Sequence, residues 1–266
     1  MSRIGPVYLV ATVNDPHNRL AELTRQWLPS LLNLYCGAAL LCSQATSPET
    51  VTLLQDLGAT AACDEDEPDG HAYIGRKRRQ ALRLGLAAEA EHLHLFDFDR
   101  ALHWAATYAH ELCQTVAAIP VYDLLVLGRT PRAFETHPPY QTHTERLANY
   151  AFGLAFGQEM DITAGSRALS RHAASFLLDH SQEQGVGVDA EWPLLLRRVP
   201  DMKVGYRLCE GLELETPDCF GPEIETAGGL TAWVETMNAS PQRWAHRLCM
   251  AAEIAEAAAR LSGHGE

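Results

Sequence analysis

Two aspartates follow an apolar run near the middle of the chain. The run over residues 92–96 predicts a buried strand, and Asp97 and Asp99 come directly after it. Alternate residues of a strand point to the same side, so the two carboxylates can face one point in space. Such a pair suits a hard divalent cation, which prefers oxygen ligands and often shares its coordination shell with substrate phosphates. A solvated acidic turn explains the pair alone equally well.

A group of cations precedes this strand. The residues Gly75-Arg76-Lys77-Arg78-Arg79 open a helix that we predict over residues 72–90. Backbone amides and the helix dipole favour anions at a helix N-terminus, and added cations favour phosphate there. A solvated basic face is the ordinary interpretation of such a run. Because the run lies in an acidic protein and its helix directly precedes the strand that carries Asp97 and Asp99, we favour a site for a metal-bound diphosphate.

The first hundred residues alternate strand and helix signals. Apolar runs predict strands over residues 7–13, 38–42 and 60–63, in addition to the strand before Asp97. Four strand–helix units predict a parallel sheet with right-handed crossovers. Ligands of such sheets lie beyond the carboxyl ends of the strands, which is where Asp15 and the aspartate pair fall.

The second half of the chain is less regular. We predict strands over 122–127 and 203–208, a long loop over 130–144, helices over 145–156, 170–180 and 192–198, and a packing helix after residue 239. The predicted fold class is therefore α/β, with a mostly parallel sheet, flanking helices and a C-terminal helical extension. We divide the chain into a nucleotide-binding type of α/β domain over residues 1–216 and a helical extension over 217–266.

Composition limits the partners. The 266 residues carry a formal net charge of -13, which argues against nucleic acid because phosphate backbones need a broad basic surface. No apolar run approaches the roughly 18 residues that an integral membrane segment needs. The seven cysteines are scattered without a C-x-x-C pair, which is typical of free thiols in a reducing compartment, so we expect a cytoplasmic protein.

The order of these motifs resembles the GT-A fold glycosyltransferases, which use nucleotide-diphosphate sugars. It is most similar to their family-two and polyprenyl-phosphate-mannose-synthase-like group, over roughly residues 6–215. The segments that carry the resemblance are Val13-Asn14-Asp15, the helix positions Gly75, Lys77, Ala81 and Gly85, the pair Asp97-x-Asp99, Leu127-Gly128-Arg129, the stretch from Asp161 to Arg171, and Asp189-Ala190-Glu191.

The resemblance implies a role for each of these groups. Thr12, Asn14 and Asp15 would approach the nucleoside, and Lys77 and Arg167 would close on the phosphates. Asp97 and Asp99 would hold Mg²⁺ or Mn²⁺ against the diphosphate. Asp189, or failing that Glu191, would act as general base on the acceptor hydroxyl of an inverting enzyme. Helix capping explains Asp189 and Glu191 equally well without the family.

The chain also departs from the family pattern. Ser43-Gln44 replaces the usual acidic residue after the second strand, and Arg100 directly follows the aspartate pair, where a small or apolar residue is usual. The family's common membrane-binding extension is not seen after residue 216, so we expect a small-molecule acceptor rather than a polyprenyl phosphate.

The resulting hypothesis is a soluble, metal-dependent glycosyltransferase with a nucleotide-sugar donor. One alternative is a degenerate GT-A domain that binds a nucleotide or a partner without catalysis. A haloacid-dehalogenase-type phosphatase also carries D-x-D after an apolar strand, but normally near the N-terminus. A sugar nucleotidylyltransferase needs a glycine-rich loop after the first strand, which this sequence lacks.

Overall fold

The computed structural model describes residues 7–64 and 70–263. These residues form a sheet of seven strands in the order β3-β2-β1-β4-β6-β5-β7. Strand β6 is antiparallel to both of its neighbours, and the other pairs are parallel. The strands are β1 Val7–Val13, β2 Ala38–Cys42, β3 Thr60–Cys63, β4 His92–Asp97, β5 Leu124–Arg129, β6 Ser166–Ser170 and β7 Val204–Cys209.

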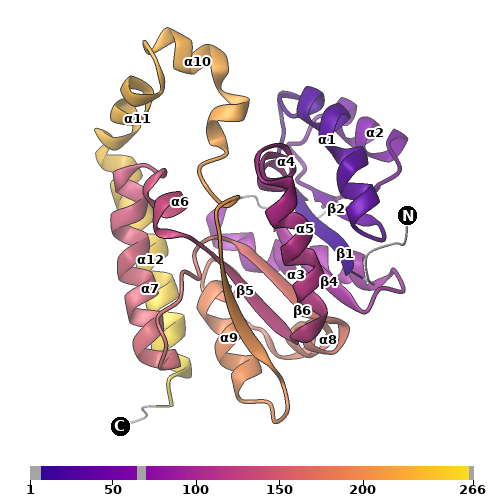
Figure 1. Ribbon diagram of the computed structural model, residues 1–266. Coiled ribbons are helices and arrows are strands. Elements are labelled where there is room, and N and C mark those ends of the chain that lie inside the picture. The colour runs from indigo at the N-terminus through magenta and orange to yellow at the C-terminus, as the bar shows by residue number, and fades with distance from the viewer. Residues whose placement is uncertain (1–6, 65–69, 264–266) are drawn as a thin grey trace.

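Helices cover both faces of this sheet (Figure 1). They are α1 Ala21–Leu34, α2 Pro48–Asp56, α3 Ile74–Leu86, α4 Phe98–Thr107, α5 Ala109–Ala118, α6 Pro131–Glu135, α7 Pro139–Phe156, α8 Arg171–His180, α9 Val188–Arg197, α10 Gly221–Thr226, α11 Leu230–Asn238 and α12 Pro241–Leu261, with short 3₁₀ turns at His71–Tyr73, Ile119–Val121 and Thr216–Cys219. The predicted α/β class, with its mostly parallel sheet and C-terminal helical part, is confirmed.

The alternation of strand side chains produces two apolar layers. Leu9 and Ala11 of β1 pack into one core with Leu28 of α1 and Trp104 of α4. Val10, which points the other way, packs into a second core that is built largely from α3, α7, α8, α9 and α12. Because both faces are covered, β1 and β2 are largely apolar, as is usual for parallel sheets.

The prediction of a loop over residues 130–144 is wrong. Thr130 caps α6, because its hydroxyl accepts a hydrogen bond from Ala133 N at 3.1 Å, and Pro131 follows at the first turn. Pro139 likewise stands at the start of α7. A proline is compatible with the first turn of a helix, where its missing N–H has no intrahelical partner. The prolines that indicated a loop therefore mark two helix starts.

The C-terminal part leaves the sheet after β7 and ends in a helix that packs against other helices. Helices α10 and α11 form an arm at the top of Figure 1, and α12 then runs beside α7. Helix α12 also contacts α9, so it completes one apolar layer of the molecule. The division at residue 216 stays an interpretation of the sequence.

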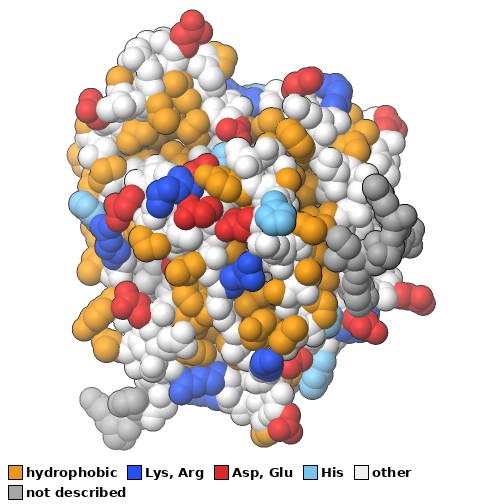
Figure 2. Space-filling model, viewed as in Figure 1, with side chains coloured by type: hydrophobic (Ala, Val, Ile, Leu, Met, Phe, Trp, Pro, Cys, Tyr) orange, Lys and Arg blue, Asp and Glu red, His pale blue; other side chains and the backbone are white. Residues whose placement is uncertain are grey.

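On the face shown in Figure 2, acidic, basic and apolar side chains are interspersed. Within the described ranges, no helix combines the length and apolarity that membrane crossing requires.

Candidate functional site

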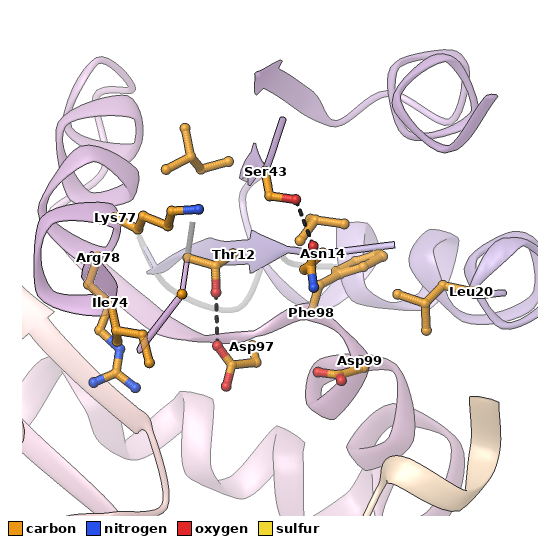
Figure 3. Close-up of a pocket in the computed structure, with 13 residues that line it drawn as sticks. Thr12, Asn14, Leu20, Ser43, Ile74, Lys77, Arg78, Asp97, Phe98 and Asp99 are labelled. Carbon is orange, nitrogen blue, oxygen red and sulfur yellow. Dashed lines mark hydrogen bonds between the residues drawn. The ribbon is translucent and has the colours of Figure 1, made fainter. Parts of the chain in front are cut away.

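A cavity of about 370 Å³ opens at the carboxyl ends of β1, β2 and β4. The N-terminal turns of α3 and α4 close its sides (Figure 3). Its lining combines apolar, hydroxyl, amide, basic and acidic side chains: Thr12, Val13, Asn14, Leu20, Leu41, Ser43, Gly70, Ile74, Lys77, Arg78, Asp97, Phe98 and Asp99. The cavity lies where ligands of parallel sheets bind.

Asp97 is the last residue of β4 and is oriented by the neighbouring strand. Thr12 of β1 is its register partner, and Thr12 Oγ1 donates a hydrogen bond of 2.8 Å to Asp97 Oδ1. Among the described residues, none donates a hydrogen bond to Asp97 Oδ2. One oxygen of this carboxylate is thus fixed by the sheet while the other remains available to a ligand.

Asp99 reaches the same cavity from the first turn of α4. The strand ends at Asp97 and the helix begins at Phe98, so the predicted strand alternation is wrong as the reason why the two carboxylates converge. A strand-to-helix turn brings both into the cavity (Figure 3). Asp99 Oδ1 accepts a hydrogen bond of 2.8 Å from Arg100 N.

Burial, together with the charges of Glu215 and Asp97, raises the pKa of Asp99 to about 7 against the opposing charge of Arg100. A neighbouring positive charge would restore the ionised form.

The donor set suits a hard divalent cation that keeps part of its shell for other ligands. Two carboxylates supply oxygen, and in the described ranges no group of three or more His, Cys, Asp or Glu is arranged to hold a metal ion. Mg²⁺ is typically bound in this way, by one or two carboxylates together with water and substrate phosphates. Asp97 and Asp99 thus fit Mg²⁺ or Mn²⁺ bound together with a phosphate ligand.

The basic run of α3 is distributed among different partners. Lys77 and Arg78 line the cavity. Arg76 lies near Asp64, with 3.6 Å between Nη2 and Oδ2, and Arg79 donates to Ser181 Oγ at 3.0 Å. The run is therefore not a solvated basic face, since each of these side chains is at least partly buried.

Lys77 is a partly buried cation in this cavity. Desolvation lowers its pKa, and the charge of Asp64 acts in the opposite direction across 4.0 Å. A desolvated ammonium group lacks part of its hydration shell, so an anionic ligand in the cavity would stabilise it.

The predicted nucleoside residues divide into two groups. Thr12 and Asn14 line the cavity, and Asn14 Oδ1 accepts a hydrogen bond of 2.8 Å from Ser43 Oγ. Asp15 is buried outside the lining and accepts hydrogen bonds from Arg19 N at 2.7 Å and Leu20 N at 3.0 Å. Asp15 thereby shapes the turn that positions Leu20 on the cavity wall.

Arg167 and Asp189 form a buried cluster beside the cavity. Asp189 Oδ1 accepts hydrogen bonds from Arg78 Nη1 and Arg167 Nη2, and all three residues are buried. Arg167 also lies over the ring of Trp192, 5.3 Å from its centroid. Asp189 and Arg167 are absent from the cavity lining and are connected to it through Arg78.

Glu191 lies in another environment. Its carboxylate accepts hydrogen bonds from Ser181 Oγ, from Gln182 N at 2.7 Å and from Glu183 N at 3.2 Å. These contacts hold the loop between α8 and α9. The structure therefore brings together Asp97, Asp99, Thr12, Asn14 and Lys77, and leaves Asp15, Arg167, Asp189 and Glu191 outside the lining.

The sequence does not predict a role for several residues of the lining. In the sequence, nothing distinguishes Arg78 from Arg76 and Arg79 of the same basic run. Only its position on α3 places Arg78 in the cavity lining. The apolar wall of Leu20, Leu41 and Ile74 has no sequence signal, because apolar residues in these elements equally indicate core.

Comparisons with known proteins give structural similarity only. Neither a family profile nor a curated protein sequence matches the chain. Glucosyl-3-phosphoglycerate synthase from Mycobacterium tuberculosis, solved with Mn²⁺, uridine diphosphate and phosphoglyceric acid, matches 75% of this chain and 67% of its own, at 15% identity and a TM-score of 0.49. The same enzyme with Mg²⁺ and uridine diphosphate matches 75% of this chain and 68% of its own, at 14% identity and a TM-score of 0.49. A structure described as a mycobacterial protein matches 84% of this chain and 75% of its own, at 15% identity and a TM-score of 0.47.

Proposed function

We propose that this protein transfers a sugar from a nucleotide-diphosphate sugar to a hydroxyl group of a small molecule. The resemblance of its motifs to those of the GT-A glycosyltransferases, most of all the family-two and polyprenyl-phosphate-mannose-synthase-like group, supports this proposal. One observation carries the proposal: Asp97 and Asp99 line a single cavity together with Lys77 and Arg78. Carboxylates for a cation and cations for phosphate in one cavity match a metal-bound diphosphate.

The cavity offers a different wall to each part of the donor. Asn14 and Ser43 supply polar groups, and Val13, Leu20 and Leu41 supply apolar surface, so this end suits a nucleoside. Lys77 and Arg78 face the diphosphate, where arginine can bind two oxygens at once.

The leaving group of the reaction is a nucleoside diphosphate, whose negative charge increases as the sugar–phosphate bond breaks. Asp97 and Asp99 would hold Mg²⁺ or Mn²⁺ there, and the cation would neutralise this charge. Lys77 and Arg78 act on the same charge from the side of α3. We assign Asp189 and Arg167 to holding Arg78 in place, while Asp189 as general base stays an alternative prediction.

Thermal unfolding with and without ligand tests the proposal. We expect UDP or GDP, or one of their sugars, to raise the melting temperature only when Mn²⁺ is present. A ligand at about a hundredfold its Kd stabilises a protein by about 2.7 kcal/mol. The Asp99→Ala variant should lose this stabilisation, while the exposed Arg83→Met variant should keep it. Release of the nucleoside diphosphate from the stabilising sugar donor, dependent on a hydroxyl acceptor, would show transfer.

A binding module without catalysis is the second candidate. It is favoured by the contacts of Asp189, the expected general base: its carboxylate accepts hydrogen bonds from two arginines, Arg78 and Arg167. This candidate predicts stabilisation by a nucleotide and no release from any sugar donor. Stabilisation that is independent of metal, or hydrolysis of simple phosphate esters, would contradict the glycosyltransferase proposal.

A further inference from the structure

Arg100 is a buried cation next to the two carboxylates that line the cavity. It follows Asp99 in the first turn of α4, and only 7% of it is exposed. Its guanidinium donates two hydrogen bonds from Nη2 to Glu215, at 3.0 Å to Oε1 and 3.1 Å to Oε2. Nη1 donates to the carbonyl oxygen of Ala164, which precedes β6. Arg100 is thus held at two points away from its own helix.

The charge of Arg100 also acts on the metal-binding pair. Arg100 directly follows Asp99 in the chain, and its backbone N–H donates a hydrogen bond of 2.8 Å to Asp99 Oδ1, so its positive charge lies beside this carboxylate and also acts on Asp97. Arginine binds carboxylates in a bidentate manner, so an Arg100 without a partner of its own would compete for these two. It would then occupy the oxygens that a cation needs.

Glu215 removes this competition. When both are ionised, Asp97 and Asp99 carry two negative charges, and Arg100 alone would cancel one of them. Glu215 is as buried as Arg100, with 8% exposed, and forms a neutral pair with it. The local charge available to a divalent cation is then that of two carboxylates.

We propose that Glu215 is a positioning residue that keeps Arg100 away from Asp97 and Asp99 and so maintains their affinity for the cation. The inference rests on the proposed function, because it assumes that these carboxylates bind a divalent cation with the nucleotide. It also gives a role to the segment after β7, which supplies Glu215.

Neighbouring acids anchor this segment independently of Glu215. Asp218 Oδ2 lies 2.7 Å from His103 Nδ1, and Glu213 Oε1 lies 3.4 Å from His103 Nε2. Arg132 also pairs with Glu213 at 2.5 Å. Glu213→Gln is therefore a matched control, because it weakens the anchoring of the same segment and leaves the contacts of Arg100 unchanged.

The test is the affinity for Mn²⁺ in the presence of UDP or GDP, whichever stabilises the wild type, measured by electron paramagnetic resonance. We expect Glu215→Gln to weaken Mn²⁺ binding about tenfold, because it leaves a buried charge without its partner. The double variant Arg100→Met/Glu215→Met should bind Mn²⁺ within about threefold of the wild type, since removal of a buried pair together is often tolerated. Glu213→Gln should also stay within about threefold, as expected for a more exposed pair.

Each other outcome has a defined meaning. Unchanged binding in Glu215→Gln overturns the inference. So does equal weakening in the single and double variants, because Glu215 would then bind the cation or only anchor the segment. Arg100→Met alone gives a second route if Glu215→Gln does not fold: its Mn²⁺ affinity should equal or exceed that of the wild type, and a loss of about tenfold would overturn the inference. A wild type that binds no Mn²⁺ with any nucleotide overturns the proposed function itself.

Discussion

Thr12 and Asp97 are register partners across β1 and β4, and the Thr12 hydroxyl holds one oxygen of the Asp97 carboxylate at 2.8 Å. The orientation of Asp97, which we propose as a metal ligand, is therefore set by a neighbouring strand rather than by its own. Side chains paired in a parallel sheet keep a fixed spacing, so this contact presents the second oxygen of Asp97 to the cavity in a defined direction.

Replacing Thr12 tests this orientation. We expect Thr12→Val to weaken Mn²⁺ binding about tenfold, because a hydrogen bond to a charged group contributes about 1.5–3 kcal/mol. The shape of the side chain is kept, so the melting temperature without ligand should change little. Thr12→Ser restores the hydroxyl and should bind nearly as the wild type. Equal binding by the valine and serine variants would contradict the assignment.

Lys77 should act on the diphosphate rather than on the nucleoside. We expect Lys77→Met to weaken the binding of UDP or GDP about tenfold, because the variant loses a charge-assisted contact with phosphate. Binding of the corresponding nucleoside should change far less. Arg83→Met on the same helix is the control, because Arg83 is exposed and outside the lining. Isothermal titration with nucleoside, mono- and diphosphate gives the comparison, and a uniform loss across the three ligands would refute it.

The sequence predicts the first half of the fold well. Local signals coincide there: apolar runs form β1, β2 and β4, and the basic run falls in the first turns of α3. Asp97 and Asp99 could be assigned to one site because they lie next to each other in the chain at a strand end.

The remaining site depends on contacts between distant segments. Thr12 meets Asp97 across 85 residues, and Arg78 meets Asp189 across 111. A single sequence gives no signal for such pairings. Asp15 shows the same limit. Its position after a strand end in the sequence is compatible both with a ligand contact and with the role that it has, which is to accept hydrogen bonds from the backbone amides of Arg19 and Leu20.

An Asp189 variant distinguishes two roles for this residue: holding Arg78 in place, or acting as the general base. Loss of its charge leaves Arg78 and Arg167 buried without a counter-ion, so we expect Asp189→Asn to reduce the free energy of unfolding by about 3 kcal/mol. The control is Glu135→Gln, which breaks an exposed pair with Arg146 and should cost less than about 1 kcal/mol. Urea unfolding measures both variants. An Asp189→Asn protein of wild-type stability that binds the donor but transfers no sugar would instead identify Asp189 as the base.

Acid should destabilise the protein through two buried histidines. Burial lowers the pKa of His94 to about 3. Burial, together with the charges of Arg129 and Arg100, lowers that of His137 to about 2. Below about pH 6.5 the unfolded chain binds protons that the folded protein does not, so the free energy of unfolding falls by up to about 1.4 kcal/mol per pH unit for each histidine.

Asp99 acts in the opposite direction between about pH 4 and 7, because its raised pKa makes the folded state the one that binds the proton. The contribution of a single histidine is therefore best isolated by comparing slopes. We propose urea unfolding at pH 7.5, 6.5, 5.5 and 4.5. The slope of the free energy of unfolding against pH should be smaller for His94→Asn than for the wild type, by the amount that corresponds to about one bound proton. Parallel curves for the variant and the wild type would contradict the assignment.

The last helix should be part of the core rather than an independent extension. Ile254 of α12 is 4% exposed and packs in the same cluster as Phe152 of α7, while Leu248 on the same helix is 49% exposed. We expect Ile254→Ala to reduce the free energy of unfolding by about 2–4 kcal/mol, because it leaves a cavity in that cluster. Leu248→Ala removes a similar side chain from the surface and should cost less than about 0.5 kcal/mol. Urea unfolding followed by both far-UV circular dichroism and tryptophan fluorescence should give one coincident transition for Ile254→Ala, since α12 and the sheet would then unfold together. Two separate transitions, with only the first shifted by Ile254→Ala, would instead show that residues 217–266 unfold as a unit of their own.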